Sequence, residues 1–126
     1  MTQPGRARSR LQAFRYAFSG WWYVLRTQRN AWIHLLSTIV VLALGTYLGL
    51  MPLEWAVLAA AIGLVWSAEF VNTALEAVVD LASPEMHPLA RVGKDVGAAA
   101  VLISAIIAVV IGILILGPPT YQLIFP

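Results

Sequence analysis

The chain has little of the chemistry that soluble proteins carry on their surfaces. Of its 126 residues only 11% are charged, cysteine is absent, and Lys94 is the one lysine. Without cysteine, the chain has no disulfides, thiolate zinc sites or thiol nucleophiles. Together with a mean hydropathy of +0.81, the shortage of charge argues against a soluble domain. It predicts a small membrane protein that forms a single domain over residues 1–126.

Acidic residues are scarce outside one stretch, residues 66–95. This stretch holds five of the six acidic residues, namely Glu69, Glu76, Asp80, Glu85 and Asp95. The first three carboxylates and Asn72 fall within an arc of roughly 80° on a helix. A polar face on an otherwise apolar helix is costly in a membrane, so it predicts a functional site. The alternative is a structural role in which Glu69 bonds to a buried Asn or Ser.

Three runs with few or no charges are long enough to cross the hydrocarbon of a membrane. We therefore expect an all-α membrane protein with transmembrane helices at residues 32–51, 54–81 and 95–117. The last helix is expected to stop at Gly117-Pro118-Pro119. An irregular start at residues 1–7 precedes residues 8–29, whose apolar positions follow helical spacing. That pattern predicts an amphipathic helix lying in the membrane interface.

Positive charge is also unevenly distributed. Six of the seven arginines precede residue 30, and the remaining cations, Arg91 and Lys94, border the predicted loop at residues 82–95. The positive-inside rule places the N-terminus and this loop on the cytoplasmic side of the membrane. Because the N-terminal arginines flank an apolar helical stripe, a membrane surface is the expected partner and nucleic acid is not.

The carboxylates of this stretch are expected to lie at different depths in the membrane. Along a helix, Glu69 lies about 16 Å from Asp80, and Glu76 lies about one turn from Asp80. Glu69, far from water, suits a general base for a hydroxyl near the headgroups, whereas Glu76 suits Mg²⁺, which prefers oxygen ligands and keeps several waters. Lys94 and Asp95, expected at a helix start with free backbone N–H groups, suit phosphate binding. The alternative for Lys94 is a plain positive-inside anchor.

Two segments resemble a known family. Glu69–Asp80 reads EFVNTALEAVVD and Ser83–Leu102 reads SPEMHPLARVGKDVGAAAVL. With the residues from about Phe14 to Leu116, these segments resemble the prokaryotic diacylglycerol kinase and undecaprenol kinase family. The resemblance implies a homotrimeric membrane kinase that transfers the γ-phosphoryl group of MgATP to a lipid hydroxyl, at sites shared between protomers. An oligomer is expected independently, because three short helices can hardly enclose three carboxylates alone.

The resemblance also implies roles for individual residues. Glu69 would be the catalytic base, with Asn72 beside it and Lys94 at the transferred phosphate. The residues implied to bind MgATP are Tyr16, Gln28, Glu76, Glu85, His87, Lys94 and Asp95, with Gln28 and Glu76 holding the Mg²⁺. The residues implied to contact the lipid are Glu69, Trp55 and Ala98. Taken alone, Tyr16 is equally typical of an interfacial aromatic, and Glu85 and His87 of exposed loop residues; a nucleotide contact from Arg8 or Arg10 stays open.

The chain departs from the family pattern at residues 28–34. Where relatives of the undecaprenol kinase type read ERNFRIH, this chain reads QRNAWIH. Gln28 thus replaces a glutamate that shares the metal with Glu76, which removes one negative charge although an amide oxygen still ligates Mg²⁺. The Ile33-His34 pair favours undecaprenol over diacylglycerol as the acceptor. Two alternatives stay open: a catalytically weakened member that binds nucleotide or lipid, and a small ion pathway.

Overall fold

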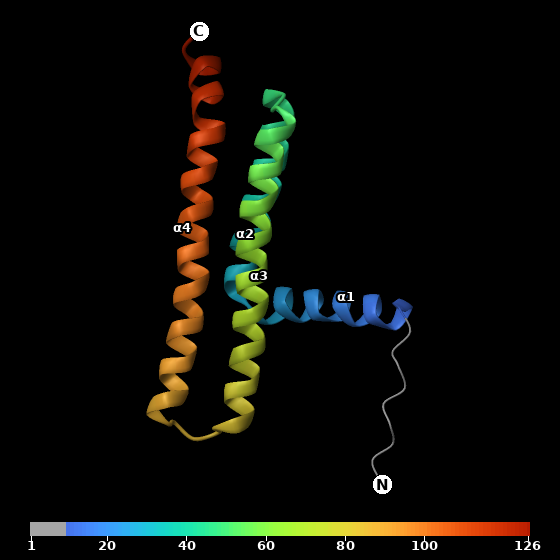
Figure 1. The fold of residues 1–126 in the computed structure, drawn as a ribbon, viewed down its shortest axis with the longest axis vertical. Coiled ribbons are helices and arrows are strands. Elements are labelled where there is room, and N and C mark those ends of the chain that lie inside the picture. The colour runs from blue at the N-terminus through green and yellow to red at the C-terminus, as the bar shows by residue number, and fades with distance from the viewer. Residues whose placement is uncertain (1–9) are drawn as a thin grey trace.

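The computed structural model describes residues 10–126, and within them the chain forms four helices. The helices are α1 (Arg10–Thr27), α2 (Arg29–Leu48), α3 (Pro52–Ala82) and α4 (Pro88–Ile124). The last three form a bundle, and α1 projects sideways from it (Figure 1). Among the described residues α2, α3 and α4 are long and apolar enough to cross a membrane, so the all-α class is confirmed and these three helices are candidate spans. The irregular start expected at residues 1–7 and the first residues of the helix expected from residue 8 lie outside the described part of the chain.

Gln28 is the single residue between α1 and α2. Its backbone is extended, with φ −102° and ψ 114°, which interrupts the helix. Its N–H still donates to the Val24 carbonyl at 2.8 Å, and its carbonyl accepts from the Ala31 N–H at 3.2 Å. The chain therefore turns at this one residue, and these two backbone hydrogen bonds hold the corner from which the Gln28 side chain projects.

The turn between α2 and α3 is short because Gly49 closes it. Gly49 has φ 66° and ψ 48°, the left-handed conformation that glycine adopts most readily. The Met51 N–H then donates to the Glu54 carboxylate at 2.8 Å, and Pro52 occupies the first position of α3. Proline and a carboxylate in the first turn both favour a helix start. As a result α3 packs back along α2.

Trp66 of α3 holds α1 and α2 against the bundle. Trp21 of α1 packs on Trp66 with ring centroids 4.8 Å apart, and on Phe70 with centroids 4.7 Å apart. The indole N–H of Trp66 donates to the Thr38 hydroxyl of α2 at 3.1 Å. Val24 of α1 is buried in the same cluster. These contacts set α1 at the level of Trp66 and Phe70, so that the second half of α3 extends beyond α1 (Figure 1).

Helix α4 is longer than expected at both ends. It begins at Pro88, capped by His87, whose Nδ1 accepts the Leu89 N–H at 3.1 Å. The predicted start at Lys94-Asp95 is therefore wrong, because Pro88 is well suited to a first helical position. The predicted stop at Gly117-Pro118-Pro119 is also wrong, since α4 continues to Ile124. The fixed φ of proline suits a helix, and Gly117 has no Cβ to clash with the Pro118 ring.

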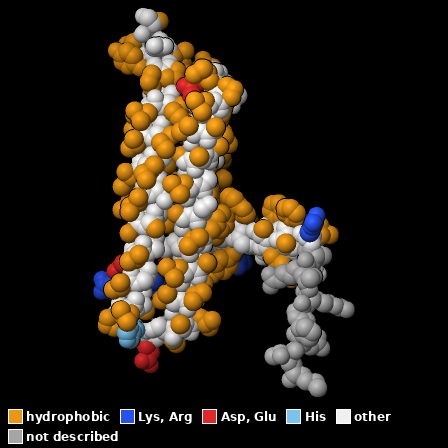
Figure 2. Space-filling model, in the orientation of Figure 1, with side chains coloured by type: hydrophobic (Ala, Val, Ile, Leu, Met, Phe, Trp, Pro, Cys, Tyr) orange, Lys and Arg blue, Asp and Glu red, His pale blue; other side chains and the backbone are white. Residues whose placement is uncertain are grey.

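Apolar side chains cover the outside of the bundle, and charged side chains gather near the α3–α4 loop (Figure 2). On the half of the bundle around the α2–α3 turn, Glu54 is the one acidic side chain among the described residues. Most of the large apolar side chains of α4 are exposed in the single chain. An exterior of this kind suits hydrocarbon rather than water.

Candidate active site

Glu69 is almost completely buried, with 1% of its surface exposed. Its Oε2 lies 3.5 Å from the Nε2 of His34. Neither atom has a hydrogen-bond partner within residues 10–126. Leaving a buried polar group unpaired costs about 1–3 kcal/mol, and an expensive arrangement of this kind inside an apolar bundle points to function. The expected alternative, a Glu69 carboxylate bonded to Asn or Ser, is not observed at Oε2.

Asn72 lies about one turn farther along α3, opposite Gly97 of α4. Its Nδ2 donates to Glu76 Oε1 at 3.2 Å, while its Oδ1 is buried without a partner among the described residues. A Cβ on Gly97 of α4 would collide with this Oδ1 and approach Leu75 Cδ2 to 3.2 Å. Glycine at position 97 is therefore what allows α4 to pass over the Asn72 side chain.

Glu76 lies between two amides. Gln28 Nε2 donates to Glu76 Oε2 at 3.1 Å, and Asn72 Nδ2 donates to the other carboxylate oxygen. Because an amide exchanges its oxygen and nitrogen by a half-turn, both side chains can direct oxygens toward a cation. One carboxylate with two amide oxygens fits Mg²⁺ that keeps several waters. Within residues 10–126 no group of three His, Cys, Asp or Glu side chains supplies a more anionic metal site.

These groups share one small cavity of about 260 Å³ between α2, α3 and α4. Its lining includes Gln28, Asn30, His34, Glu69, Asn72, Glu76 and Ala98. The structure thus brings together the predicted base, its amide neighbour, both predicted metal ligands and one predicted lipid contact. Glu69 and Glu76 thus both line one cavity.

Four residues of the segment Ser83–Leu102 that are predicted to bind the nucleotide lie apart from this cavity, around the α3–α4 loop. They are Glu85, His87, Lys94 and Asp95. Lys94 forms an ion pair with Asp80 of α3, and Asp95 lies 3.9 Å from Arg91, with both side chains more than 70% exposed. Because α4 begins at Pro88, the first backbone N–H groups of the helix lie next to His87 and not at Lys94, where they were expected. This end of the bundle therefore presents exposed charges of both signs.

Two predicted residues are not brought to the cavity. Trp55 lies near the start of α3, about 21 Å along the helix from Glu69. Its ring occupies the space left by Gly45 of α2, where an added Cβ would lie 2.8 Å from Trp55 Cη2. Tyr16 lies about 18 Å along α1 from the corner at Gln28. Neither side chain lines the cavity in this chain.

His34 was not predicted to belong to the site, although the structure places it 3.5 Å from Glu69. The sequence does mark this residue, because His34 is the one acidic or basic side chain inside the first apolar span. Ionisable residues inside spans are functional candidates by default, which is the reasoning that selected Glu69. What the sequence could not supply is the pairing, since the two residues lie on different helices.

Comparison with known proteins identifies the family of this chain. The model of the family described as prokaryotic diacylglycerol kinase matches residues 15–116. The chain belongs to this family. The expected family is thus confirmed, and with it the enzyme class of its members, lipid kinases.

Individual relatives differ in their acceptor. A diacylglycerol kinase of Synechocystis sp. is 44% identical over 114 residues, which cover 90% of this chain and 65% of that protein. The chain therefore spans just under two thirds of that relative. The undecaprenol kinase of Bacillus subtilis is 39% identical over 107 residues, or 85% of this chain and 87% of that protein. The diacylglycerol kinase of Escherichia coli K12 is 33% identical over 95 residues, covering 70% and 78%.

Proposed function

We propose that this chain is a lipid kinase that transfers the γ-phosphoryl group of MgATP to the hydroxyl of a membrane lipid. The observation that carries the proposal is the shared cavity. There, the buried Glu69, whose Oε2 has no hydrogen-bond partner among residues 10–126, lines the same cavity as a donor set that fits Mg²⁺. Phosphoryl transfer depends on positioning and electrostatics, with a base for the attacking hydroxyl and a cation for the phosphates.

Each residue of the cavity has a definite part in this proposal. Glu69 Oε2 accepts the proton of the lipid hydroxyl, and His34 Nε2 holds the carboxylate toward the cavity. Glu76, with the amide oxygens of Gln28 and Asn72, would hold the Mg²⁺, which would supply positive charge to offset that of the phosphates. Lys94 binds phosphate by exchanging its partner Asp80 for the nucleotide.

We place α1 in the membrane interface. Four large apolar side chains of α1 are 64–80% exposed, namely Leu11, Phe14, Phe18 and Trp22. Because α1 meets α3 at Trp66 and Phe70, Glu69 then lies at headgroup level and not about 16 Å beneath it. The rest of α3, about 18 Å long from Phe70 to Ala82, extends into the cytoplasm. This arrangement lets an aqueous nucleotide and a lipid hydroxyl meet at one level of a bacterial inner membrane.

We further propose a homotrimer with shared sites. Glu85, His87, Lys94 and Asp95 lie near one loop, whereas Tyr16 lies far along α1 from the cavity of its own chain. A nucleotide contact from Tyr16 therefore requires the cavity of a neighbouring protomer. Protomers in a membrane associate through close packing of their helices. The side chains exposed on all three spans are available for such packing.

Gln28 supports a second candidate function. With an amide where the family pattern has a glutamate, the site has one negative charge fewer for its metal. A weakened family member that binds nucleotide or lipid without efficient transfer is consistent with this substitution.

The acceptor and the activity are tested together. Purified protein in mixed micelles is given radiolabelled ATP, Mg²⁺ and one of undecaprenol, dioleoylglycerol or ceramide. We expect label in undecaprenyl phosphate at a rate above that of the other lipids. Preferred labelling of dioleoylglycerol would change the proposed acceptor to diacylglycerol but would still support lipid kinase activity. Binding of MgATP without labelling of any lipid would favour the weakened member.

A further inference from the structure

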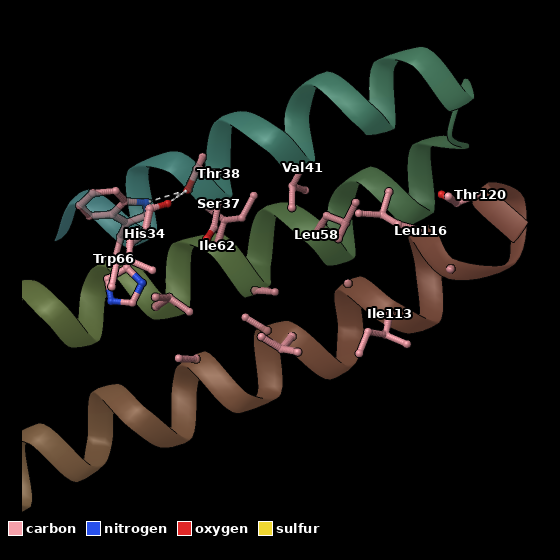
Figure 3. A pocket seen from close by; sticks show the side chains of 18 of the residues that line it. His34, Ser37, Thr38, Val41, Leu58, Ile62, Trp66, Ile113, Leu116 and Thr120 are labelled. Atoms are coloured by element: carbon pink, nitrogen blue, oxygen red, sulfur yellow. Dashed lines mark hydrogen bonds between the residues drawn. The ribbon is translucent and has the colours of Figure 1, made fainter. Parts of the chain in front are cut away.

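Trp66 makes a polar contact that the packing of α1 does not require. Its side chain is buried, and its indole Nε1–H donates to the Thr38 hydroxyl of α2 at 3.1 Å (Figure 3). The phenyl ring of Phe70 also packs on Trp21, with centroids 4.7 Å apart, so an aromatic ring without an N–H suffices for that packing. The indole N–H therefore points to a second role for Trp66, toward α2.

Thr38 extends this contact to the backbone of His34. Its Oγ1 accepts from the indole and donates to the His34 carbonyl at 2.7 Å. Both bonds can form together, because a hydroxyl has one donor hydrogen and two acceptor lone pairs. A threonine bond to the carbonyl four residues earlier is ordinarily confined to its own helix. Here the same oxygen also ties the turn of α2 that carries His34 to Trp66 of α3.

Trp66 also contacts the imidazole ring of His34 directly. The ring centroids are 6.1 Å apart and the planes are inclined by 70°, an edge-on arrangement within the usual range of aromatic pairs. Glu69 follows Trp66 by three residues, so the two side chains are neighbours on the surface of α3. The imidazole is therefore held at two points by the same part of α3 that carries Glu69.

The spacing between His34 and Glu69 makes their alignment sensitive to small movements. Nε2 and Oε2 are 3.5 Å apart, just beyond the 2.7–3.2 Å of an ordinary hydrogen bond. Neither atom has another partner among residues 10–126. Hydrogen bonds of catalytic groups often tighten only in the reacting complex, and a misplacement of about 1 Å can cost about a hundredfold in rate. A residue that fixes the level of His34 thus affects the base.

We propose that Trp66 and Thr38 are positioning residues for Glu69, because the indole N–H and the threonine hydroxyl hold His34 at the level where its Nε2 meets Glu69 Oε2. The inference rests on the proposed lipid kinase function and adds two residues to it. Both residues act through His34, so their removal should lower kcat and not the affinity for ATP. The same removal should have no effect once His34 is absent.

Thr38→Val and Trp66→Phe each break the hydrogen bond while keeping a side chain of similar shape. With undecaprenol as the acceptor, we expect kcat to fall about two- to tenfold in either variant, the equilibrium range of one net hydrogen bond. The KM for ATP should keep its wild-type value, and Thr38→Ser, which retains the hydroxyl, should restore kcat. Thr46→Val is the matched control, because the exposed Thr46 makes the same bond within α2, to the Leu42 carbonyl at 2.7 Å.

A double variant separates positioning from general damage to the fold. In a His34→Ala background, adding Thr38→Val should lower kcat no further, because the residue through which Thr38 acts is gone. A further fall as large as that in the wild-type background would overturn the proposal. Wild-type kcat in both Thr38→Val and Trp66→Phe would overturn it as well.

The position of His34 is also measured without catalysis. The chain has two histidines, His34 and His87, so the ring nitrogens of ¹⁵N-histidine-labelled protein in micelles give two sets of NMR signals, which His34→Ala assigns. We expect the His34 signals to move in Thr38→Val and Trp66→Phe but not in Thr46→Val, with His87 as the internal reference.

The two measurements separate failure of the inference from failure of the proposed function. Moved His34 signals in a protein that phosphorylates no lipid would keep the contact and reject the function. Lipid phosphorylation with unmoved His34 signals and wild-type kcat in both variants would keep the function and reject the positioning role.

Discussion

Gln28 and Glu76 are joined by a hydrogen bond of 3.1 Å between Gln28 Nε2 and Glu76 Oε2, although 48 residues separate them in the chain. Gln28 occupies the corner between α1 and α2, and Glu76 lies on the part of α3 that extends beyond α1. The family pattern has a glutamate at this corner, which would bring two carboxylates together. The charge of the proposed metal site therefore depends on residue 28.

Gln28→Glu should lower the Mg²⁺ concentration that gives half-maximal activity by about tenfold, equivalent to 1.4 kcal/mol. The new carboxylate attracts the cation, and the amide no longer has to turn its oxygen inward. Without Mg²⁺ the two carboxylates repel, so the melting temperature should fall and should recover on Mg²⁺ addition. Gln122→Glu, at the opposite end of the bundle, is the control and should change neither quantity. An unchanged Mg²⁺ requirement in Gln28→Glu would remove residue 28 from the metal site.

Asp80→Asn should decrease the KM for ATP by a few-fold at most, because an exposed ion pair is worth about 0.2–1 kcal/mol. Asp80 pairs with Lys94 in the chain, and its removal leaves the ammonium for phosphate. Asp80→Glu keeps the negative charge and should keep the wild-type KM. A higher KM in Asp80→Asn would mean that Asp80 orients Lys94 for the nucleotide rather than competing with it.

Gly97→Ala should destabilise the protein by about 1–3 kcal/mol, the usual penalty of overpacking. The added methyl collides with Asn72 Oδ1 and crowds Leu75. Thermal unfolding in detergent measures the effect. Gly112→Ala is the control, since its Cβ meets open space. Adding Asn72→Ala to Gly97→Ala should restore stability but not activity. Wild-type stability in Gly97→Ala would mean that α3 and α4 are farther apart at this level.

His34→Ala should reduce kcat by at least about tenfold, in the range of groups that orient a general base. The KM for ATP should stay near wild type, because His34 contacts Glu69 and not the predicted nucleotide residues. Ser37→Ala, about one turn farther along α2 and not part of the cavity lining, is the control and should keep the wild-type kcat. A loss confined to the KM for ATP would reject the positioning role of His34.

Much of this architecture follows from local patterns in the sequence. The three spans follow from uncharged runs, and the spacing of Glu69, Asn72 and Glu76 places them on one face of α3. The level at which α1 meets α3 could not be predicted, because it depends on the contact of Trp21 with Trp66, two residues far apart in the chain. The proposed depth of Glu69 differs from the predicted depth for this reason. The ends of α4 were predicted too short, because prolines were taken as breaks where one begins the helix and two are accommodated within it.

Contacts between side chains on different helices could not be predicted from the sequence either. Gln28 was predicted to share a site with Glu76 only through the family pattern, and the hydrogen bond between them arises from the corner in the backbone. His34 was left out of the site because nothing local to α2 indicates that Glu69 faces it. The ring of Trp55 lies in the space left by Gly45, at the other end of α3 from the cavity. Its predicted contact with the lipid stays a prediction.

The most direct test of the central claim is lipid-dependent ATP turnover by the purified protein, compared with that of Glu69→Gln. We expect ADP release with Mg²⁺ to rise several-fold when undecaprenol is added to the wild-type protein. In Glu69→Gln this stimulation should disappear, while binding of a fluorescent ATP analogue keeps its wild-type affinity. Lipid-stimulated turnover that persists in Glu69→Gln would contradict the assignment of Glu69 as the base, and with it the proposed function of the cavity.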